Sequence, residues 1–293
     1  MNLTAFGSSG IEVSRLGLGA GGLGDVGLSE KDAERLLLGA VDRGVTFVDA
    51  ARSYGAAEDR IGRYLGARRG QVVLSTKGGY GVDRVDDWTG EAVRRGVDDA
   101  LRRLRTDRVD LFHLHSCPVD VLARGDVVEA LLEARRAGKI RLAAYSGENE
   151  ALAHAVASGA FGGIQCSVNV FDQRAIEGSV AEAARRGIGV VGKRPLANCA
   201  WRYGERPVGH YAEEYWRRMR AMGLDPSPLE WGELALRFAA FAPGVCTVIV
   251  GTTRLEHLGA NLRALERGPL EDTVRDRVRE AFRARDDGWI GQV

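Results

Sequence analysis

The chain has 293 residues, of which 45% are apolar, and its 41 lysines and arginines nearly balance its 40 aspartates and glutamates. This length suits two small domains or one large barrel, and the apolar fraction is sufficient for a buried core. The formal net charge of +1 gives no field that would attract nucleic acid or an anionic membrane, so neither is expected as a partner.

Cysteine usage and the N-terminal residues indicate the compartment. Cys117, Cys166, Cys199 and Cys246 are scattered without a Cys-x-x-Cys pair, which argues against a metal site or a disulfide framework and fits a reducing environment. The first residues have neither the basic start nor the apolar run of a signal peptide, and no apolar run approaches the ~20 residues of a membrane span. We therefore expect a cytoplasmic protein. A monomer or a small homo-oligomer is expected, although nothing in the sequence selects between the two.

Short apolar runs alternate with helical patterns along most of the chain. Such runs, without polar alternation, are typical of strands buried on both faces. The expected strands are 14–20, 45–51, 71–77, 108–115, 140–147, 162–169, 188–194 and 246–252, and the expected helices are 30–43, 57–67, 90–104, 126–137, 149–158, 175–187 and 229–240. This alternation predicts a parallel sheet, and eight units favour an α/β fold closed as a (β/α)8 TIM barrel, one domain spanning 1–293.

Three features lie outside the repeating units. We expect an N-terminal hairpin before the barrel and a final helix plus tail in 269–293. A long loop and helix insertion, 195–228, follows the seventh strand and is rich in aromatic residues, glycine and proline. Loops of this length in compact domains are usually functional, so the insertion is expected to serve the site.

The early glycines Gly17, Gly19 and Gly22 have the spacing of a dinucleotide-binding Rossmann turn. Such a turn needs a helix that begins directly at it and an acidic residue that closes the next strand. Asp49 meets the second requirement, but helix signals begin only at Ser29, a candidate N-cap. The eightfold repeat also argues against a Rossmann domain.

Four polar residues fall at one predicted end of the barrel. Asp49, Lys77 and His115 end three consecutive expected strands, and Tyr54 lies in the loop just after the first of them. In a (β/α)8 barrel the C-terminal ends of the strands form the active-site face. The sequence therefore predicts that these four side chains share one mouth.

The chemistry of these four residues is that of carbonyl reduction. An ammonium beside a tyrosine hydroxyl stabilises the phenolate, and a carboxylate keeps that ammonium charged. Tyr54 would then donate a proton to a carbonyl oxygen while a hydride reaches the carbon, and His115 would stabilise the charge that develops on the oxygen. No other redox group is evident in the chain, so the hydride has to come from a cofactor.

These residues and their surroundings resemble the aldo-keto reductases over nearly the whole chain. The strongest stretches are "TFVDAARSYGAAEDRIGRYL", "STKGG", "VDLFHLHSCP", "GKIRLAAYSG" and "IVGTTRLEHLGANL". The resemblance implies an Asp–Tyr–Lys–His tetrad at Asp49, Tyr54, Lys77 and His115 and an extended NAD(P)H bound without a Rossmann domain. It also implies that a small aldehyde, ketone or sugar-like carbonyl compound is interconverted with its alcohol.

The resemblance also implies which residues hold the nicotinamide half of the cofactor. The positions are Gly19, Ala20, Gly21, Asp49, Ser146 and Gln165, of which the last two would bond the carboxamide. Gly147 stands where the family often has asparagine. Lys193 and Arg194 stand where many members stack an aromatic ring on nicotinamide, so the stacking residue is either missing or replaced by the aliphatic stem of a basic side chain.

For the phosphate half, we expect Gly251 and Thr252 to open a helix whose N-terminus receives phosphate. Many NADPH-preferring relatives have lysine at the position of Gly251 and arginine at that of His257, and both are absent here. Arg254 could contact a 2′-phosphate instead, because a guanidinium suits bidentate phosphate binding, and Asn261 matches an adenine contact. NADPH is therefore the expected cofactor, with NADH as the alternative.

Other readings of the sequence remain open. His113 shares strand parity with His115 and is expected to be a satisfied core histidine. Some barrels of the resembled family are regulatory subunits that bind the nucleotide and a membrane-protein partner with little or no turnover, although the intact tetrad disfavours this role. A metal-dependent isomerase or aldolase would need a carboxylate and histidine cluster that the sequence does not display.

Overall fold

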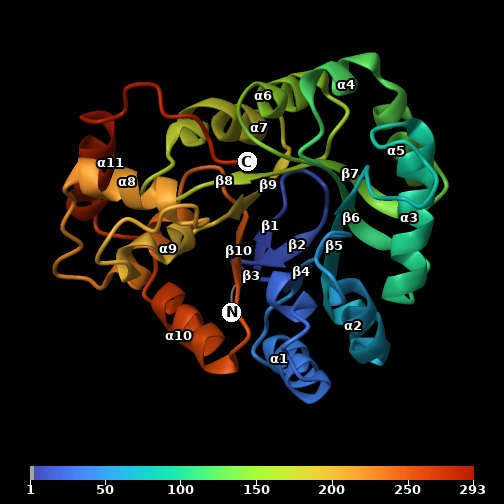
Figure 1. Ribbon diagram of the computed structural model, residues 1–293, viewed down its shortest axis with the longest axis horizontal. Coiled ribbons are helices and arrows are strands. Elements are labelled where there is room, and N and C mark those ends of the chain that lie inside the picture. Colours follow the sequence, from blue (N-terminus) through green and yellow to red (C-terminus); the bar gives the residue numbers. More distant parts are fainter. Residues whose placement is uncertain (1–2) are drawn as a thin grey trace.

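The structure, a computed structural model, describes residues 3–293, and its centre is a closed barrel of parallel strands (Figure 1). Strands that follow each other in the chain pair in parallel, and the last strand closes the barrel by pairing Val248 with Leu16 of the first. The barrel strands are β3 (Leu16–Gly19), β4 (Phe47–Asp49), β5 (Val73–Gly78), β6 (Val109–His115), β7 (Ile140–Ser146), β8 (Gly163–Ser167), β9 (Gly189–Lys193) and β10 (Thr247–Gly251). The predicted TIM barrel is confirmed.

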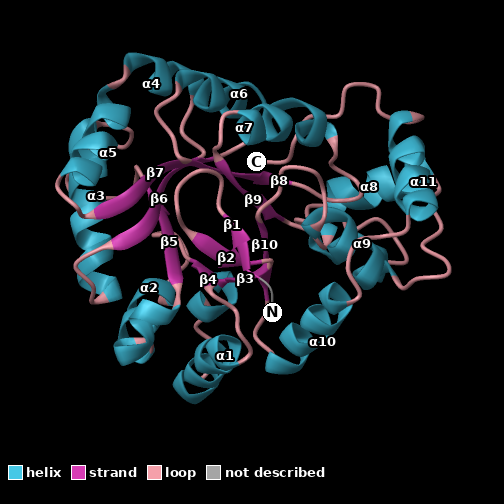
Figure 2. Ribbon diagram, turned by 180° about the vertical axis from the view of Figure 1, so that it is seen from behind, coloured by secondary structure: helices cyan, strands magenta, loops and turns pink. Residues whose placement is uncertain are grey.

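Helices surround the barrel, and α8, α9 and α11 gather at one side of it (Figure 2). The helices are α1 (Glu30–Asp42), α2 (Ala57–Tyr64), α3 (Gly90–Leu104), α4 (Val119–Arg124), α5 (Asp126–Arg136), α6 (Asn149–Ser158), α7 (Ala181–Arg185), α8 (Glu213–Met222), α9 (Trp231–Ala240), α10 (Leu255–Glu266) and α11 (Asp272–Arg283). Ser29 caps α1 as predicted, because its hydroxyl accepts the Asp32 N–H at 3.1 Å. Over the described residues 3–293, no helix has the length and hydropathy to cross a membrane.

The helix predicted at 175–187 is divided in two. A π-helical turn covers Ile176–Val180, and α7 follows it directly. The cause is Gly178, whose backbone (φ −96°, ψ −107°) leaves the helical region. Glycine tolerates this conformation because it has no Cβ.

The parts outside the barrel have the secondary structure expected of them. The N-terminal hairpin pairs β1 (Leu3–Ala5) with β2 (Glu12–Ser14). The insertion after β9 contains a 3-10 turn, Ala197–Arg202, and then α8. After α11, the last residues return to the barrel, where Arg218 of α8 donates to the carbonyl of Ile290 at 2.7 Å.

The hairpin closes the N-terminal end of the barrel with the ring of Phe6, which is fully buried. A Cβ on Gly189 would lie 2.2 Å from this ring, and one on Gly163 would lie 3.1 Å from it. The Phe6 and Phe47 rings stack with centroids 6.3 Å apart. The glycines that begin β8 and β9 therefore make room for the Phe6 ring, which plugs this end of the barrel. The open mouth is at the other end, where the strands have their C-termini.

We predict that Phe6→Ala lowers the free energy of unfolding by about 3–5 kcal/mol, because the residual cavity at the barrel end cannot collapse. Urea unfolding followed by circular dichroism measures the change. Val26→Ala is the control, since Val26 is 95% exposed and its truncation is expected to stay within about 0.5 kcal/mol of the parent. Equal stability of the two variants would contradict the conclusion that the Phe6 ring stabilises the closed end of the barrel.

Candidate active site

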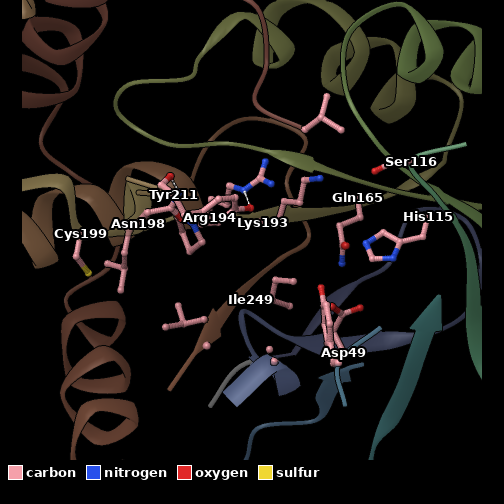
Figure 3. Close-up of a pocket in the computed structure, with 18 residues that line it drawn as sticks. Asp49, His115, Ser116, Gln165, Lys193, Arg194, Asn198, Cys199, Tyr211 and Ile249 are labelled. Carbon is pink, nitrogen blue, oxygen red and sulfur yellow. Dashed lines mark hydrogen bonds between the residues drawn. The ribbon is translucent and has the colours of Figure 1, made fainter. Parts of the chain in front are cut away.

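The open mouth of the barrel holds a cavity of about 470 Å³. Asp49, Tyr54 and His115 line it, and Lys77 lies buried beside Asp49. Figure 3 shows the side chains of Asp49, His115 and Gln165 directed toward a common space. Other lining residues come from the strand ends and loops of β3, β8, β9 and β10 and from the tail: Gly19, Gly21, Gln165, Lys193, Arg194, Ile249, Gly251 and Val293.

The base of the cavity is an ion pair between the ends of β4 and β5. Lys77 Nζ donates to Asp49 Oδ2 at 2.5 Å and to the Ala50 carbonyl at 2.7 Å, and the two side chains are 0% and 1% exposed. Burial by itself lowers the pKa of Lys77, but the negative charge of Asp49 and the hydrogen bonds to the ammonium outweigh it, and the pKa is raised. Lys77 is therefore charged.

Tyr54 is brought against this ion pair by the turn that follows β4. Its backbone N–H donates to the Ala51 carbonyl at 3.0 Å. Lys77 Nζ lies 5.0 Å from the centroid of the Tyr54 ring. The Tyr54 and His115 rings meet edge to face with centroids 6.2 Å apart. The structure thus brings the four predicted tetrad residues together.

His115 is the last residue of β6 and is partly buried. Burial, and then the positive charge of Lys77, lower the pKa of His115 to about 2. Its Nδ1 lies 2.7 Å from the hydroxyl of Tyr80. The imidazole is therefore neutral near pH 7 and has one nitrogen, Nε2, that is not engaged by Tyr80.

His113 lies deeper on the same strand and acts on the ion pair through Ser75. Its Nε2 is 3.0 Å from Ser75 Oγ, and Ser75 donates to Asp49 Oδ1 at 2.8 Å. Burial lowers the pKa of His113 to about 4. Its Nδ1 has no hydrogen-bond partner among the described residues, so the expectation of a satisfied core histidine holds for one nitrogen only.

Ser146 and Gln165, the residues predicted to bond a carboxamide, bond each other and leave one donor free. Ser146 Oγ donates to Gln165 Oε1 at 3.0 Å. Gln165 Nε2 is buried and has no partner within residues 3–293, although Gln165 lines the cavity. Buried amide groups are rarely left unpaired, so this donor fits the carbonyl oxygen of a nicotinamide carboxamide.

Gly147 departs from the pattern of the resembled family for a steric reason. A Cβ at this position would lie 2.3 Å from the hydroxyl of Tyr145, which donates to the Cys117 carbonyl at 3.0 Å. Tyr145 is buried and fixed by this bond, so it cannot move aside without losing it. The space that an asparagine would need is therefore occupied.

Lys193 turns its charged end away from the centre of the cavity. Its Nζ lies 3.1 Å from Oε1 of buried Glu148, and burial lowers the pKa of Lys193. The same Glu148 oxygen accepts the N–H and hydroxyl of Ser167, to which Arg194 also donates at 2.9 Å. Glu148 belongs to no sequence motif described above, although it holds Lys193 at the cavity wall.

The segment between β10 and α10, predicted to receive the cofactor phosphates, differs from the prediction in one respect. The helix α10 begins at Leu255 with Arg254 as its N-cap, so the expectation that Gly251 and Thr252 open it is wrong. The reason is that Thr252 Oγ1 accepts the Arg254 N–H at 3.1 Å and forms a turn first. Arg254 is 65% exposed.

Not all predicted cofactor residues line the cavity. Gly19, Gly21, Asp49, Gln165, Lys193 and Gly251 do. Ala20 and Ser146 are fully buried behind its wall. His257 and Asn261 lie on α10, and His257 Nδ1 is 3.4 Å from Thr252 Oγ1.

Tyr80, which contacts His115, was not among the residues predicted from the sequence, because those predictions relied on residues at strand ends and no strand ends at Tyr80. Its position three residues after Lys77, and therefore in a loop at the same mouth, is the signal that could have identified it.

Comparisons with known proteins identify the family. The sequence model of the Aldo/keto reductase family matches residues 15–283. "Uncharacterized oxidoreductase YqkF" of Bacillus subtilis is 27% identical over 286 residues, which cover 90% of this chain and 91% of that protein. A "Probable voltage-gated potassium channel subunit beta" of Arabidopsis thaliana is 27% identical over 329 residues, covering 97% and 98%. The solved holo form of aldo-keto reductase AKR11C1 from Bacillus halodurans superposes with a TM-score of 0.84 at 26% identity, covering 96% of each chain. The chain belongs to the aldo/keto reductase family.

Proposed function

We propose that this family member is an NAD(P)H-dependent oxidoreductase that interconverts a small aldehyde, ketone or sugar-like carbonyl compound and its alcohol. The observation that supports this most directly is the buried Lys77–Asp49 ion pair beneath the ring of Tyr54. Both Tyr54 and neutral His115 line the cavity at the mouth of the barrel.

Each tetrad residue has one role in the proposed reaction. Tyr54 is the general acid that protonates the carbonyl oxygen, and it is the base in the reverse direction. The Lys77 ammonium stabilises the phenolate that forms, and Asp49 keeps this ammonium charged and in place. His115 binds the carbonyl oxygen and stabilises its developing charge. A reduced nicotinamide bound in the cavity would supply the hydride.

The residues present fit such a cofactor. The unpaired Nε2 of Gln165 would bond the carboxamide, and Ser146 orients the Gln165 side chain. A Cβ on Gly21 would meet no atom within 4 Å, and the nearest atom to one on Gly251 would be 3.8 Å away, so both glycines leave room along the wall. Gly19, Ala20, Asp49 and Lys193 complete the proposed nicotinamide half.

We place the phosphate half at the turn between β10 and α10, with Thr252, Arg254, His257 and Asn261. NADPH is the proposed cofactor rather than NADH because Arg254 is exposed beside this turn. Its ion pair with Glu256 is also exposed and, with Nε and Oε2 3.7 Å apart, is too long for a hydrogen bond, so the guanidinium is available to a phosphate. A guanidinium in this position can form paired hydrogen bonds with a 2′-phosphate.

The second candidate is a nucleotide-binding regulatory subunit with little or no turnover. The similarity to a protein described as a potassium channel β subunit favours it to some extent. The complete tetrad favours the enzyme, since binding alone does not require a proton donor over a buried ion pair.

Tyr54→Phe is expected to lower kcat by about 100-fold or more, because the ring remains but the proton donor is lost. Oxidation of NADPH, followed by its absorbance with a panel of carbonyl compounds, measures turnover. Nucleotide binding, followed by protein fluorescence, should be unchanged. Full activity of the variant would remove Tyr54 from its role, and nucleotide binding without turnover of any carbonyl by the parent would favour the regulatory subunit.

Arg254→Gln is expected to weaken NADPH binding by about tenfold, the effect of losing a charged hydrogen bond at an exposed site, and to leave NADH binding unchanged. Titration of each nucleotide by fluorescence gives both dissociation constants. Arg263→Gln, which removes an exposed arginine farther along α10, is the matched control. A loss that is equal for the two nucleotides would refute the phosphate contact.

His113 and His115 are both expected to remain neutral between pH 6 and 8, since burial lowers the pKa of His113 to about 4 and that of His115 to about 2. Proton NMR of the imidazole C–H signals, assigned with His115→Gln, should show no titration of either ring in this range. The unfolded state binds a proton near pH 6.5 and the folded state does not, so the free energy of unfolding falls on acidification below that pH. A ring that titrates between pH 6 and 8 would contradict the assignment.

A further inference from the structure

Tyr80, two residues after β5, connects an exposed serine to the catalytic-cavity imidazole. Its hydroxyl lies 2.7 Å from His115 Nδ1 and 3.0 Å from Ser53 Oγ. The Tyr80 and His115 rings stack at an interplanar angle of 30° with centroids 5.8 Å apart. Tyr80 therefore contacts His115 by both its ring and its hydroxyl group.

The loop that carries Tyr80 is held on both sides of it. Gly79 has a φ of +115°, and a Cβ on it would lie 2.5 Å from the ring of Trp88. Trp88 donates its backbone N–H to the Gly79 carbonyl at 2.8 Å, and its ring lies 5.6 Å from that of Tyr80. On the other side, Arg52 Nε donates to the Gly81 carbonyl at 2.8 Å. The position of the Tyr80 hydroxyl is thus fixed by the fold.

A neutral imidazole carries one proton on one of its two ring nitrogens. The hydrogen-bond partner of one nitrogen therefore decides whether the other nitrogen is protonated. Two hydrogen-bond orders fit the distances among Ser53, Tyr80 and His115. In the first, the Ser53 hydroxyl donates to Tyr80, and Tyr80 donates to Nδ1, which leaves the proton on Nε2. In the second, Nδ1 donates to Tyr80 and Tyr80 donates to Ser53, which leaves Nε2 unprotonated.

We propose that Tyr80 is a positioning residue that donates its hydroxyl hydrogen to Nδ1 of His115 and so keeps the imidazole proton on Nε2. The role of Nε2 toward a substrate rests on the proposed function: a carbonyl oxygen accepts hydrogen bonds, so only the first order presents it with a donor. In the second order, a lone pair of Nε2 would face the lone pairs of that oxygen, which is repulsive. Burial and Lys77 keep the ring neutral, since its pKa is lowered to about 2.

Nitrogen-15 NMR of the imidazole rings tests the tautomer without any turnover. At pH 7 we expect His115 to have a protonated Nε2 and an unprotonated, hydrogen-bonded Nδ1, with signals assigned by their loss in His115→Asn. In Tyr80→Phe, the Nδ1 signal should move toward that of an unprotonated nitrogen without a donor. A proton on Nδ1 of the parent protein, or an Nδ1 signal that does not move in the variant, would overturn the proposal.

Steady-state kinetics tests the consequence. Tyr80→Phe should lower kcat by about tenfold, the factor that corresponds to one lost hydrogen bond, and leave the KM for the nucleotide unchanged. Ser53→Ala should shift the Nδ1 signal and kcat in the same direction by less, and it serves in place of Tyr80→Phe if that variant does not fold. An unchanged kcat in both variants would overturn the positioning role. If the parent turns over no carbonyl compound, the proposed function fails, and the NMR still decides the hydrogen-bond order.

Tyr203→Phe is the matched control, because Tyr203 pairs with His210 in the insertion as Tyr80 pairs with His115. The Tyr203 hydroxyl lies 3.1 Å from His210 Nε2, and the ring centroids are 5.0 Å apart. This variant should shift only the His210 signals and leave turnover unchanged. A shift of the His115 signals in Tyr203→Phe would mean that the NMR readout is not specific to the Tyr80 contact, and the proposal would fall.

Discussion

The ion pair between Lys77 and Asp49 is the constraint on which the site depends. Two buried charges are costly to remove from water, and they are tolerated only when each is paired and hydrogen-bonded. Strand pairing provides this, since Asp49 lies opposite Ser75 and Lys77 lies opposite His113 in the barrel register. The hydrogen bonds from Ser75 to Asp49 and from His113 to Ser75 therefore follow from the order of the strands.

The two ends of the barrel differ because small residues are placed differently at each. At the N-terminal end, Gly163 and Gly189 admit the ring of Phe6, and the end is closed. At the C-terminal end, Gly21 and Gly251 line the open cavity. A tightly packed core thus supports an open rim, where polar side chains at strand ends converge.

The eight strands and the grouping of four polar residues at one mouth could be predicted because both are local in sequence. Apolar runs define the strands, and Asp49, Lys77 and His115 lie at or next to the C-terminal ends of three of them. The start of α10 was predicted wrongly because the side-chain bond of Thr252 to the chain is decided by loop geometry. The contacts of Tyr80 with His115 and of Lys193 with Glu148 join separate loops and strand ends, so they depend on rotamers and on barrel closure, which residue patterns do not encode.

The tail after α11 has a consequence for selectivity. Arg218 binds the carbonyl of Ile290, Asn149 bonds both backbone groups of Gly291, and Arg194 binds the carbonyl of Gln292. Val293 then forms part of the cavity wall. Because these anchors lie on α6, on α8 and directly after β9, substitutions in the outer helices can reshape the cavity while Tyr54 and His115 stay in place. The shape of the cavity and the polar groups at its base can therefore diverge independently.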